Sequence, residues 1–288
     1  KDSGGIRRKE EHLDICLGGD VENRILSTGF ENYRFIHQAL PELDLDCIDT
    51  RINIFGKKLS APLMISPITG GTREGGRLNT RLAELARNKN ISLGIGSQRI
   101  AIEDRSFEES FKIRKTAPDI LLFANLGAVQ LNYGFGPEQC KRAVDMIEAD
   151  ALMLHLNPMQ EVFQDGGDHD FSDLAQKITN ICKKVNFPVI VREVGFGISA
   201  DAAKMLADAG VAGLDVGGAG GTSWIKIESS RSEDPVLKNI SKSFMDWGIA
   251  TAESLEMVSG AGSNIKVIAS GGIRTGLDAA KAIALGAD

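Results

Sequence analysis

The sequence predicts an α/β protein built as a (β/α)8 barrel, and three observations support that fold class. Short apolar segments suited to buried strands recur along the chain, most of them roughly 30 residues apart, which is the length of one β/α unit. Amphipathic helical patterns, such as Leu78, Leu82 and Leu85, lie between them. Glycine and polar residues follow nearly every segment, as at the C-terminal rim of a parallel barrel. The segments begin near Ala61, Ile91, Ile120, Ala151, Val189, Gly213 and Lys266.

A doubly wound parallel sheet would give the same alternation of strands and helices. The count favours the barrel, because seven segments are followed by the start of an eighth at Gly286-Ala-Asp288. We therefore expect a single domain over residues 1–288, with an N-terminal arm and hairpin at 1–58, the barrel at 59–288, and the eighth strand missing from this chain. Because the chain starts on Lys1 rather than Met and stops directly after a helical pattern, we expect both ends to be incomplete.

Composition excludes several classes of protein. The chain has 288 residues and a formal charge of −6, so it has no general attraction for nucleic acid or for an anionic membrane. No apolar run approaches the roughly 20 residues of a membrane-spanning helix. The four cysteines lie far apart without a C-x-x-C pair, so neither a zinc site nor a disulfide framework is indicated. We expect a soluble cytoplasmic protein that binds no nucleic acid and no membrane.

The N-terminal segment allows two interpretations and precedes a predicted hairpin. The run from Arg7 to His12 is a solvated helix start, in which glutamates offset the basic residues, or a mobile arm that brings Arg8, Lys9 and His12 to an anionic ligand. Further on, residues 45–54 and 58–63 flank Phe55-Gly-Lys57, which predicts a β-hairpin that would plug the bottom of the barrel.

Polar residues gather where the predicted strands end, and glycine there lets backbone approach a ligand closely. The accumulation predicts a flat or extended ligand across the rim. Ser270-Gly-Gly-Ile-Arg-Thr-Gly276 follows a strand and opens a helix, which predicts a phosphate site, the alternative being a tight turn without a ligand. The glycine-dense run Gly217–Thr222 would supply the second half of that cradle.

The fourth strand delivers the densest polar cluster, namely His155, Asn157, Gln160 and Glu161. Each alone would be an ordinary loop residue, but together they predict part of an active site. Glu161 could supply oxygen for Mg²⁺, as could the following acidic residues. Those acidic residues are Asp165, Asp168 and Asp170.

Two basic residues add to this rim. Arg192 and Glu193 are adjacent on the fifth strand, so one of them faces the barrel interior, and an inward arginine needs an electron-rich partner. Gln98-Arg99 adds a hydrogen-bond donor and a fixed positive charge beside the same rim.

Several runs resemble known families. The hairpin run Phe55-Gly-Lys-Lys-Leu-Ser-Ala-Pro62 and the Ser270–Gly276 run resemble the FMN-dependent barrel enzymes. Within that group the chain is similar over essentially its full length to the type 2 isopentenyl-diphosphate isomerases. The motifs that carry this likeness are Arg8-Lys9-x-x-His12, Pro67-Ile-Thr-Gly-Gly-Thr72, Gly96-Ser-Gln-Arg99, His155-x-Asn157-x-x-Gln160-Glu161 and Gly220-Gly-Thr-Ser-Trp224.

The resemblance implies a homo-oligomer (tetramer or octamer) that interconverts isopentenyl and dimethylallyl diphosphate, using reduced FMN, Mg²⁺ and NADPH as the reductant. The implied chemistry protonates the substrate's double bond and then removes a neighbouring proton. FMN would be held by Ser66, Pro67, Ile68, Thr69, Ser97, Asn125, Arg192, Gly217, Thr222, Gly272, Ile273 and Arg274. The substrate would contact Arg8, Lys9, His12, Ser97, Gln98, Arg99 and Gln160. Gln160, His155 and Asn157 would be the catalytic side chains, and Glu161 would hold the metal.

The chain departs from this family where Arg192 stands in place of the usual lysine, and in the missing eighth strand. Three rival functions remain open. A 2-hydroxy-acid oxidase of the same fold needs a His-Gly-Gly-Arg run, which the sequence lacks, and an IMP-dehydrogenase-like enzyme needs a cysteine after the sixth strand, where Gly217–Trp224 has none. The third is a flavin-binding protein with weak or no catalysis, which the departures would explain.

Overall fold

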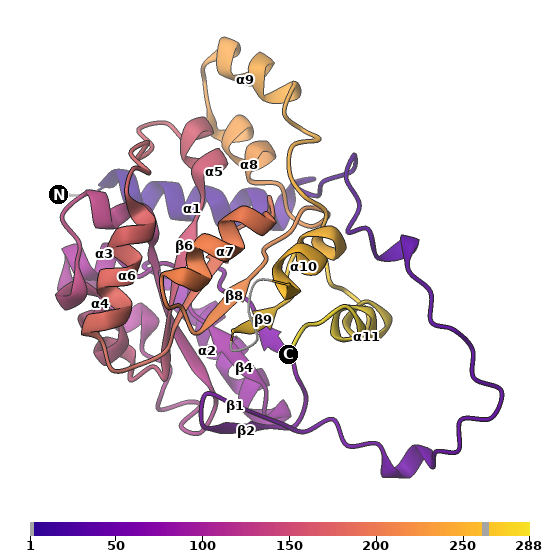
Figure 1. Cartoon of the computed structure of the whole chain (residues 1–288). Coiled ribbons are helices and arrows are strands. Elements are labelled where there is room, and N and C mark those ends of the chain that lie inside the picture. The colour runs from indigo at the N-terminus through magenta and orange to yellow at the C-terminus, as the bar shows by residue number, and fades with distance from the viewer. Residues whose placement is uncertain (1–2, 261–264) are drawn as a thin grey trace.

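The computed structural model describes residues 3–260 and 265–288 as seven parallel strands surrounded by helices (Figure 1). A two-stranded antiparallel hairpin (β1, β2) precedes the parallel sheet, whose strands are ordered β3-β4-β5-β6-β7-β8-β9. The strands are β1 Ile52–Ile54, β2 Lys57–Leu59, β3 Met64–Ile65, β4 Ser92–Gly94, β5 Leu122–Gly127, β6 Ala151–Leu156, β7 Val189–Glu193, β8 Gly213–Asp215 and β9 Lys266–Ile268.

Helices connect the strands, as parallel pairing requires. The α-helices are α1 Ser3–Gly18, α2 Arg73–Lys89, α3 Arg99–Glu103, α4 Pro137–Ile147, α5 Pro158–Phe163, α6 Leu174–Lys184, α7 Ala200–Asp208, α8 Trp224–Arg231, α9 Pro235–Lys242, α10 Thr251–Ser259 and α11 Gly276–Ala284. Short 3₁₀ helices are η1 Phe30–Asn32, η2 Leu45–Cys47, η3 Arg105–Phe111 and η4 Ala128–Asn132. Among the described residues, none of these helices combines the length and the apolarity that crossing a membrane requires.

The predicted barrel architecture is confirmed as a curled parallel sheet of seven strands, each in sequence order beside the next. Strands β5 and β7 are buried at every residue, which explains the apolar residues with which each of them begins. Within the described residues the edge strands β3 and β9 do not pair with each other, so the sheet stays open there, as expected for a barrel without its eighth strand.

The hairpin closes the bottom of the sheet, but its strands are shorter than the sequence suggested. Residues 45–47 form the 3₁₀ turn η2 rather than strand, because the Asp44 side chain accepts the backbone N–H of Asp46. The turn at Phe55 and Gly56 has positive φ at both residues, which matches the twist of a tight hairpin. Ile54 and Leu59 pack into a cluster with residues of β5, β6 and β7, so the hairpin plugs the lower end of the sheet as predicted.

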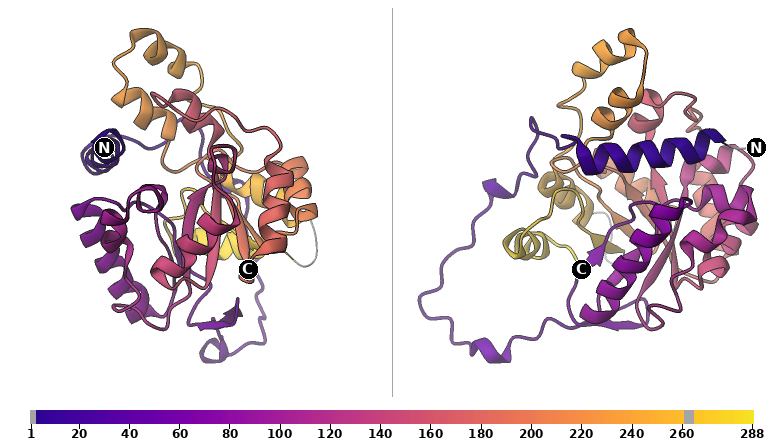
Figure 2. Two further views of the ribbon diagram at one scale, coloured as in Figure 1. Left: turned by 90° about the vertical axis from the view of Figure 1, so that its left-hand side faces the viewer. Right: turned by 180° about the vertical axis from the view of Figure 1, so that it is seen from behind.

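Two segments stand out in the ribbon views. Helix α1 runs across the upper side of the sheet beside α8, which it contacts (Figures 1 and 2). The chain between η1 and β1 arches away from the body, and Ile36, Leu40 and Leu45 on it are among the most exposed large apolar side chains. Because α1 runs across the side of the sheet where the parallel strands end, it covers the carboxyl ends of those strands.

Truncation of a core side chain should cost far more stability than truncation at the surface. Leu152 on β6 has no exposed area, so Leu152→Ala should lower the free energy of unfolding by about 2–5 kcal/mol, because it removes buried methyl groups and leaves a cavity. Urea denaturation measures this change. Met205→Ala, at a side chain 56% exposed on α7, is the matched control and should change it by less than about 0.5 kcal/mol. Equal effects of the two substitutions would contradict the packing described above.

Candidate active site

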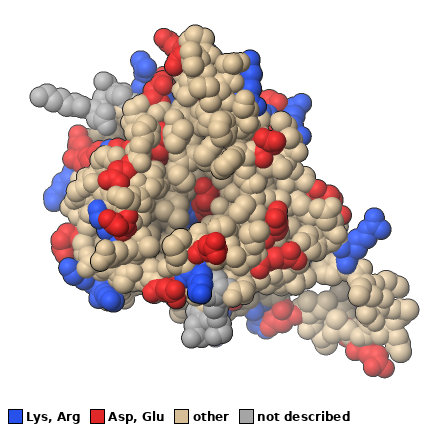
Figure 3. Space-filling model, turned by 45° about the horizontal axis from the view of Figure 1, so that its top comes forward, with Lys and Arg blue, Asp and Glu red and all other residues tan. Residues whose placement is uncertain are grey.

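A cavity of about 1170 Å³ extends along the inside of the sheet, from the hairpin to the carboxyl ends of the parallel strands. Its wall includes residues from the loops after all seven strands and from α1, and the space-filling view shows a hollow on this face with charges of both signs around it (Figure 3). Such a position is where parallel barrels place their active sites.

Most of the residues singled out in the sequence line this one cavity. They are Arg8, Lys9, His12, Ser66, Pro67, Ile68, Thr69, Ser97, Arg99, Asn125, His155, Asn157, Gln160, Glu161, Arg192, Gly217, Thr222, Gly272 and Ile273. Of the residues predicted to hold the cofactor, substrate or metal, Gln98 and Arg274 do not line the cavity. The structure therefore brings the predicted cluster together, while the individual roles stay predictions.

Gln98 and Arg274 correct the expectation that their side chains face a ligand. Gln98 has no exposed area, and its amide donates to the backbone oxygen of Ala143 at 2.9 Å and accepts from the N–H of Asn125 at 2.9 Å. It therefore ties the end of β4 to β5 and α4. The Arg274 guanidinium points to the surface and donates to Glu22 at 2.9 Å, while its neighbour Ile273 faces the cavity. Neighbours along a loop turn to different sides, which spacing alone did not reveal.

Helix α1 is docked onto the rim through Lys9. The Lys9 ammonium donates to the backbone oxygens of Gly70 at 2.7 Å and Ser97 at 3.0 Å, and it lies 5.4 Å from the centroid of the Phe111 ring. Burial, with a smaller contribution from the charge of Arg8, lowers the pKa of Lys9 to about 7. The N-terminal run is thus a helix that also carries its basic residues to the cavity, which combines the two interpretations of the sequence.

Glu228 on α8 joins α1 to the wall of the cavity. It is 1% exposed, and its Oε1 accepts from Gln160 at 3.2 Å and lies 3.0 Å from His12 Nε2. Its Oε2 accepts from Arg231 at 2.5 Å. Burial by itself raises the pKa of Glu228, but the hydrogen bond and charge of His12 and the charge of Arg231 together hold that pKa below its ordinary value.

Sequence reasoning missed Glu228. The available signal was a carboxylate that follows two apolar residues, Ile225 and Ile227, and precedes a basic residue, Arg231, by about one helical turn. A charged side chain among apolar neighbours on a short helix after a rim strand needs a partner, and here the partners are His12, Gln160 and Arg231.

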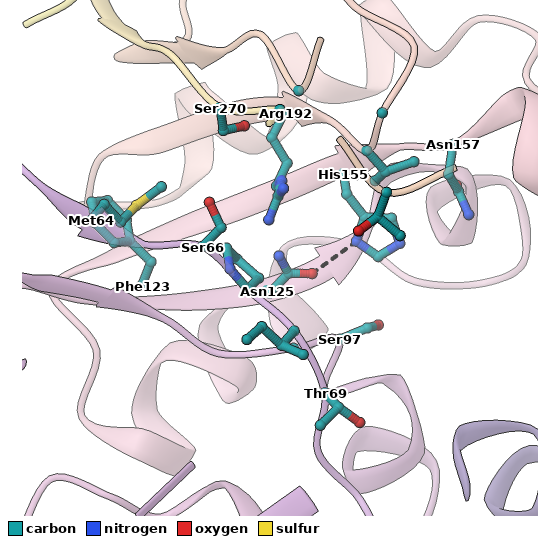
Figure 4. Close-up of a pocket in the computed structure, with 18 of the residues that line it drawn as sticks. Met64, Ser66, Thr69, Ser97, Phe123, Asn125, His155, Asn157, Arg192 and Ser270 are labelled. Carbon is teal, nitrogen blue, oxygen red and sulfur yellow. Dashed lines mark hydrogen bonds between the residues drawn. The ribbon is translucent and has the colours of Figure 1, made fainter. Parts of the chain in front are cut away.

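The end of β6 holds a network of polar side chains. His155 Nδ1 lies 2.8 Å from Asn125 Oδ1, the contact drawn in Figure 4. Because an amide oxygen only accepts, Nδ1 carries the proton and Nε2 is left as an acceptor. Burial, followed by the charges of Arg192 and Lys9, lowers the pKa of His155 to about 3. His155 is therefore neutral and cannot act as a charged acid near neutral pH.

Glu161 is held by donors on both oxygens. Its Oε1 accepts from Asn157 at 2.9 Å, and its Oε2 accepts from Gln164 and from the backbone N–H of Asp168, both at 2.9 Å. Asn157 Oδ1 is buried and has no hydrogen-bond partner in the described part of the chain. The Glu161 carboxylate and this amide oxygen are the hard oxygen donors that Mg²⁺ prefers.

The longer acidic run does not assemble into a metal site. Asp168 Oδ2 accepts from Arg99 and Gln130, and Asp170 Oδ1 accepts from Ser172. Over residues 3–260 and 265–288 no three histidine, cysteine or acidic side chains come together in a way that could hold an ion. Of that run only Glu161 and Asp165 line the cavity.

Arg192 faces the cavity and Glu193 faces away, as strand alternation predicts. In Figure 4, Arg192 lies with Ser66, Asn125 and Ser270. Its Nε lies 3.5 Å from Asp215 Oδ2, while its Nη groups donate to no residue in the described ranges. Glu193 instead accepts backbone N–H groups of residues 194–196 at 2.5–2.7 Å, although burial raises its pKa to about 7.

These features fit a flat anionic cofactor at the rim. Gly271 and Gly272 have positive φ, and the backbone N–H groups of residues 271–273 donate to no other residue that the structure describes. Free N–H groups before a helix form an anion site. Gly217 also has positive φ, and a Cβ at this position would lie 2.0 Å from the backbone carbonyl oxygen of Glu193. The loop therefore requires glycine here. The Nη groups of Arg192 supply positively charged donors beside the same space.

Comparisons with known proteins agree with this geometry. A family model described as FMN-dependent dehydrogenase matches residues 130–288. An isopentenyl-diphosphate delta-isomerase from Nostoc sp. (strain PCC 7120) is 52% identical over 281 residues, covering 98% of this chain and 80% of the relative. The protein with the same name from Oceanobacillus iheyensis is 48% identical over 287 residues, covering 100% of this chain and 82% of the relative.

Similar solved structures share the fold. A mandelate oxidase crystal structure has a TM-score of 0.57 at 20% identity, covering 96% of this chain and 78% of the other. A Pediococcus acidilactici putative lactate oxidase has a TM-score of 0.58 at 19% identity, covering 92% of this chain and 70% of the other. At these identities the likeness concerns the barrel architecture alone.

The low pKa of His155 predicts that its ring stays neutral well below pH 6. In an NMR titration, the ring signal that a His155→Gln variant lacks should keep its neutral chemical shift from pH 8 to about pH 5. Because the unfolded chain protonates this ring below its ordinary pKa of 6.5, His155 should also make folding less favourable as the pH falls below that value. A titration midpoint near the ordinary value would contradict the burial of this side chain.

Proposed function

The chain belongs to the isopentenyl-diphosphate delta-isomerase family, within the FMN-dependent enzymes, and we propose on that premise how its cavity performs the reaction. The reaction interconverts isopentenyl diphosphate and dimethylallyl diphosphate, moving a carbon–carbon double bond without a net change in oxidation state. The observation that carries the proposal is that α1 places basic residues over the same cavity in which the polar end of β6 faces Arg192 and the glycine-rich loops.

The rim loops would hold FMN. The free N–H groups of residues 271–273 fit its phosphate, and Arg192 fits the electron-rich part of the ring. Ser66, Asn125 and Ser270 lie around Arg192 and offer further hydrogen bonds. When bound, reduced FMN supplies an electron-rich ring and a group that can exchange a proton with the substrate carbons. We assign the reduction to NADPH, which the family resemblance implies.

The diphosphate of the substrate would lie toward α1. Arg8, His12 and Arg99 line that side, where phosphate oxygens can accept charge-assisted hydrogen bonds. Mg²⁺ would join the diphosphate to the Glu161 carboxylate, and the unpartnered Asn157 Oδ1 is a second oxygen within the same network. Binding at the diphosphate end supplies energy that holds the apolar five-carbon end in place.

The protein's own part in the chemistry is to orient the substrate and exclude water. Gln160, fixed by Glu228 and Asn157, would position the five-carbon unit, and neutral His155 would contribute an acceptor at Nε2. A carbocation next to water would be quenched, so the cover that α1 gives the cavity matters for the product.

The remaining assignments follow from the resemblance and from composition. We propose a homo-oligomer, a tetramer or octamer, in the cytoplasm, with no nucleic acid or membrane partner. The 2-hydroxy-acid oxidases share the barrel, but their likeness extends to the fold alone and the His-Gly-Gly-Arg run that their chemistry needs is missing here. The isomerase function therefore explains more of the residues at this site.

The direct test is conversion of the substrate. Protein loaded with FMN, reduced by NADPH and supplied with Mg²⁺ should convert isopentenyl diphosphate to dimethylallyl diphosphate, while the flavin absorbance stays bleached and NADPH is not consumed in proportion to product. Product analysis by chromatography with the flavin spectrum recorded in parallel measures both. Failure to form any dimethylallyl product with FMN bound and reduced would overturn the proposal.

Substitution at the end of β6 should separate catalysis from cofactor binding. Gln160→Ala and Glu161→Ala should each lower turnover by about 100-fold or more, because they remove substrate orientation and the metal ligand. FMN should stay bound, since neither residue belongs to the glycine-rich loops, and the flavin absorbance after gel filtration measures this. The control Asp173→Asn, an exposed residue outside the cavity, should behave as wild type. Near-normal rates in both alanine variants would refute the placement of substrate and metal.

A further inference from the structure

Asp168 connects three loops that follow successive strands of the sheet. Its Oδ2 accepts from Arg99 Nη1 at 2.6 Å and from Gln130 Nε2 at 2.9 Å. Its backbone N–H donates to Glu161 Oε2 at 2.9 Å. Arg99 follows β4, Gln130 follows β5, and Glu161 follows β6. Asp168 therefore contacts both Arg99 and Glu161, the residues proposed above to bind the diphosphate and Mg²⁺.

Two carboxylates contact the Arg99 guanidinium, and Asp168 is the one that lies outside the helix of Arg99. Arg99 is the first residue of α3, a helix of only five residues, and its side chain is 34% exposed. Its partner Glu103, at 2.8 Å, lies on the same short helix. The other partner of Arg99 is Asp168, which belongs to the polar network at the end of β6 and has a side chain 16% exposed. A long side chain near solvent samples many rotamers, so loss of Asp168 would release the guanidinium from the cavity wall.

We propose that Asp168 is a positioning residue that aims Arg99 into the cavity and thereby sets the affinity of the enzyme for the diphosphate of its substrate. The inference rests on the proposed function, because it assumes that Arg99 binds the diphosphate. Two effects of Asp168 oppose each other. Its negative charge repels an anion, whereas its hydrogen bond orients the cation that binds the anion. The direction in which KM changes when Asp168 is substituted therefore shows which effect dominates: KM rises if Asp168 mainly orients Arg99, and KM falls if Asp168 mainly repels the anionic substrate.

Removal of the carboxylate should weaken substrate binding more than it slows turnover. Asp168→Ala should raise KM for isopentenyl diphosphate about tenfold, which matches the loss of one charge-assisted hydrogen bond, and should change kcat less than about threefold. Asp168→Asn keeps an acceptor oxygen, so its KM should lie between those of wild type and Asp168→Ala. The dependence on Mg²⁺ should stay unchanged, because the backbone N–H to Glu161 survives both substitutions. Asp173→Asn removes the same charge at an exposed position outside the cavity and should leave KM unchanged.

A double-mutant cycle with Arg99→Gln decides whether Asp168 acts through Arg99. In the Arg99→Gln background, Asp168→Ala should raise KM no further than about twofold, since the group that it orients is gone. The proposal is overturned if the two effects on KM multiply independently, or if Asp168→Ala leaves KM unchanged or lowers it.

The same double-mutant cycle can be measured on the dissociation constant of inorganic diphosphate in the presence of Mg²⁺, by titration calorimetry. This measurement needs no turnover. A wild-type protein that binds diphosphate but forms no dimethylallyl product would refute the proposed function. The effect of Asp168 on diphosphate binding could still be measured in that case. Unchanged urea midpoints in all variants exclude unfolding as the cause of any loss. Independent effects of the two substitutions on diphosphate binding would refute the role of Asp168 whatever the activity.

Discussion

Parallel register places a row of polar side chains across the inside of this sheet. Gly127 on β5 pairs with His155 on β6, His155 pairs with Arg192 on β7, and Arg192 pairs with Asp215 on β8. Because parallel strands carry equivalent positions at the same height, a polar residue at the end of one strand lies beside the end of the next. The loops after β5, β6, β7 and β8 start directly above this row, and each of them contributes residues to the wall of the cavity.

Such a row is costly to bury unless each member finds a partner. His155 is paired with Asn125 and stays neutral, while Arg192 lies beside Asp215, whose other oxygen accepts from Ser270 at 2.5 Å. Burial raises the pKa of Asp215, and the charge of Arg192 acts in the opposite direction. Unused hydrogen-bonding capacity remains at the cavity in the Nη groups of Arg192 and in Asn157 Oδ1, and beneath it in Asp215 Oδ2, whose only near partner among the described residues is Arg192 Nε at 3.5 Å. Unpartnered polar groups that face a cavity are what a bound ligand would satisfy.

At the mouth of the cavity, basic side chains are held by carboxylates of the protein itself. Glu228 holds His12 and Arg231, and Asp168 holds Arg99. These contacts fix α1 and the loops in one arrangement, so that less ordering remains when an anion binds. The oxidases with the same barrel show that this architecture by itself does not set the reaction. The reaction is set by the residues that lie above the rim.

Much of the fold could be predicted from the sequence because barrel strands follow local rules. Apolar runs of the right length, spaced by one β/α unit, located all seven strands, and the turn residues Phe55 and Gly56 located the hairpin. The residues that gather at the site could also be predicted, because the C-terminal ends of parallel strands meet at one edge. The strand proposed for residues 45–54 was too long, because the Asp44 side chain competes for backbone N–H groups through a local contact that hydropathy does not report.

What only the tertiary structure decided is which way each side chain turns and what it contacts. Gln98 and Ser97 are neighbours, yet Ser97 lines the cavity and Gln98 is buried against Ala143. Glu228 lies 216 residues from His12 in sequence and 3.0 Å from it in space, and no local pattern connects two such positions. The sequence by itself determined the strands, the order of the rim loops and the family. The contacts of Lys9, Glu228 and Asp168 arise between distant segments, because packing of whole helices sets them rather than the spacing of residues along the chain.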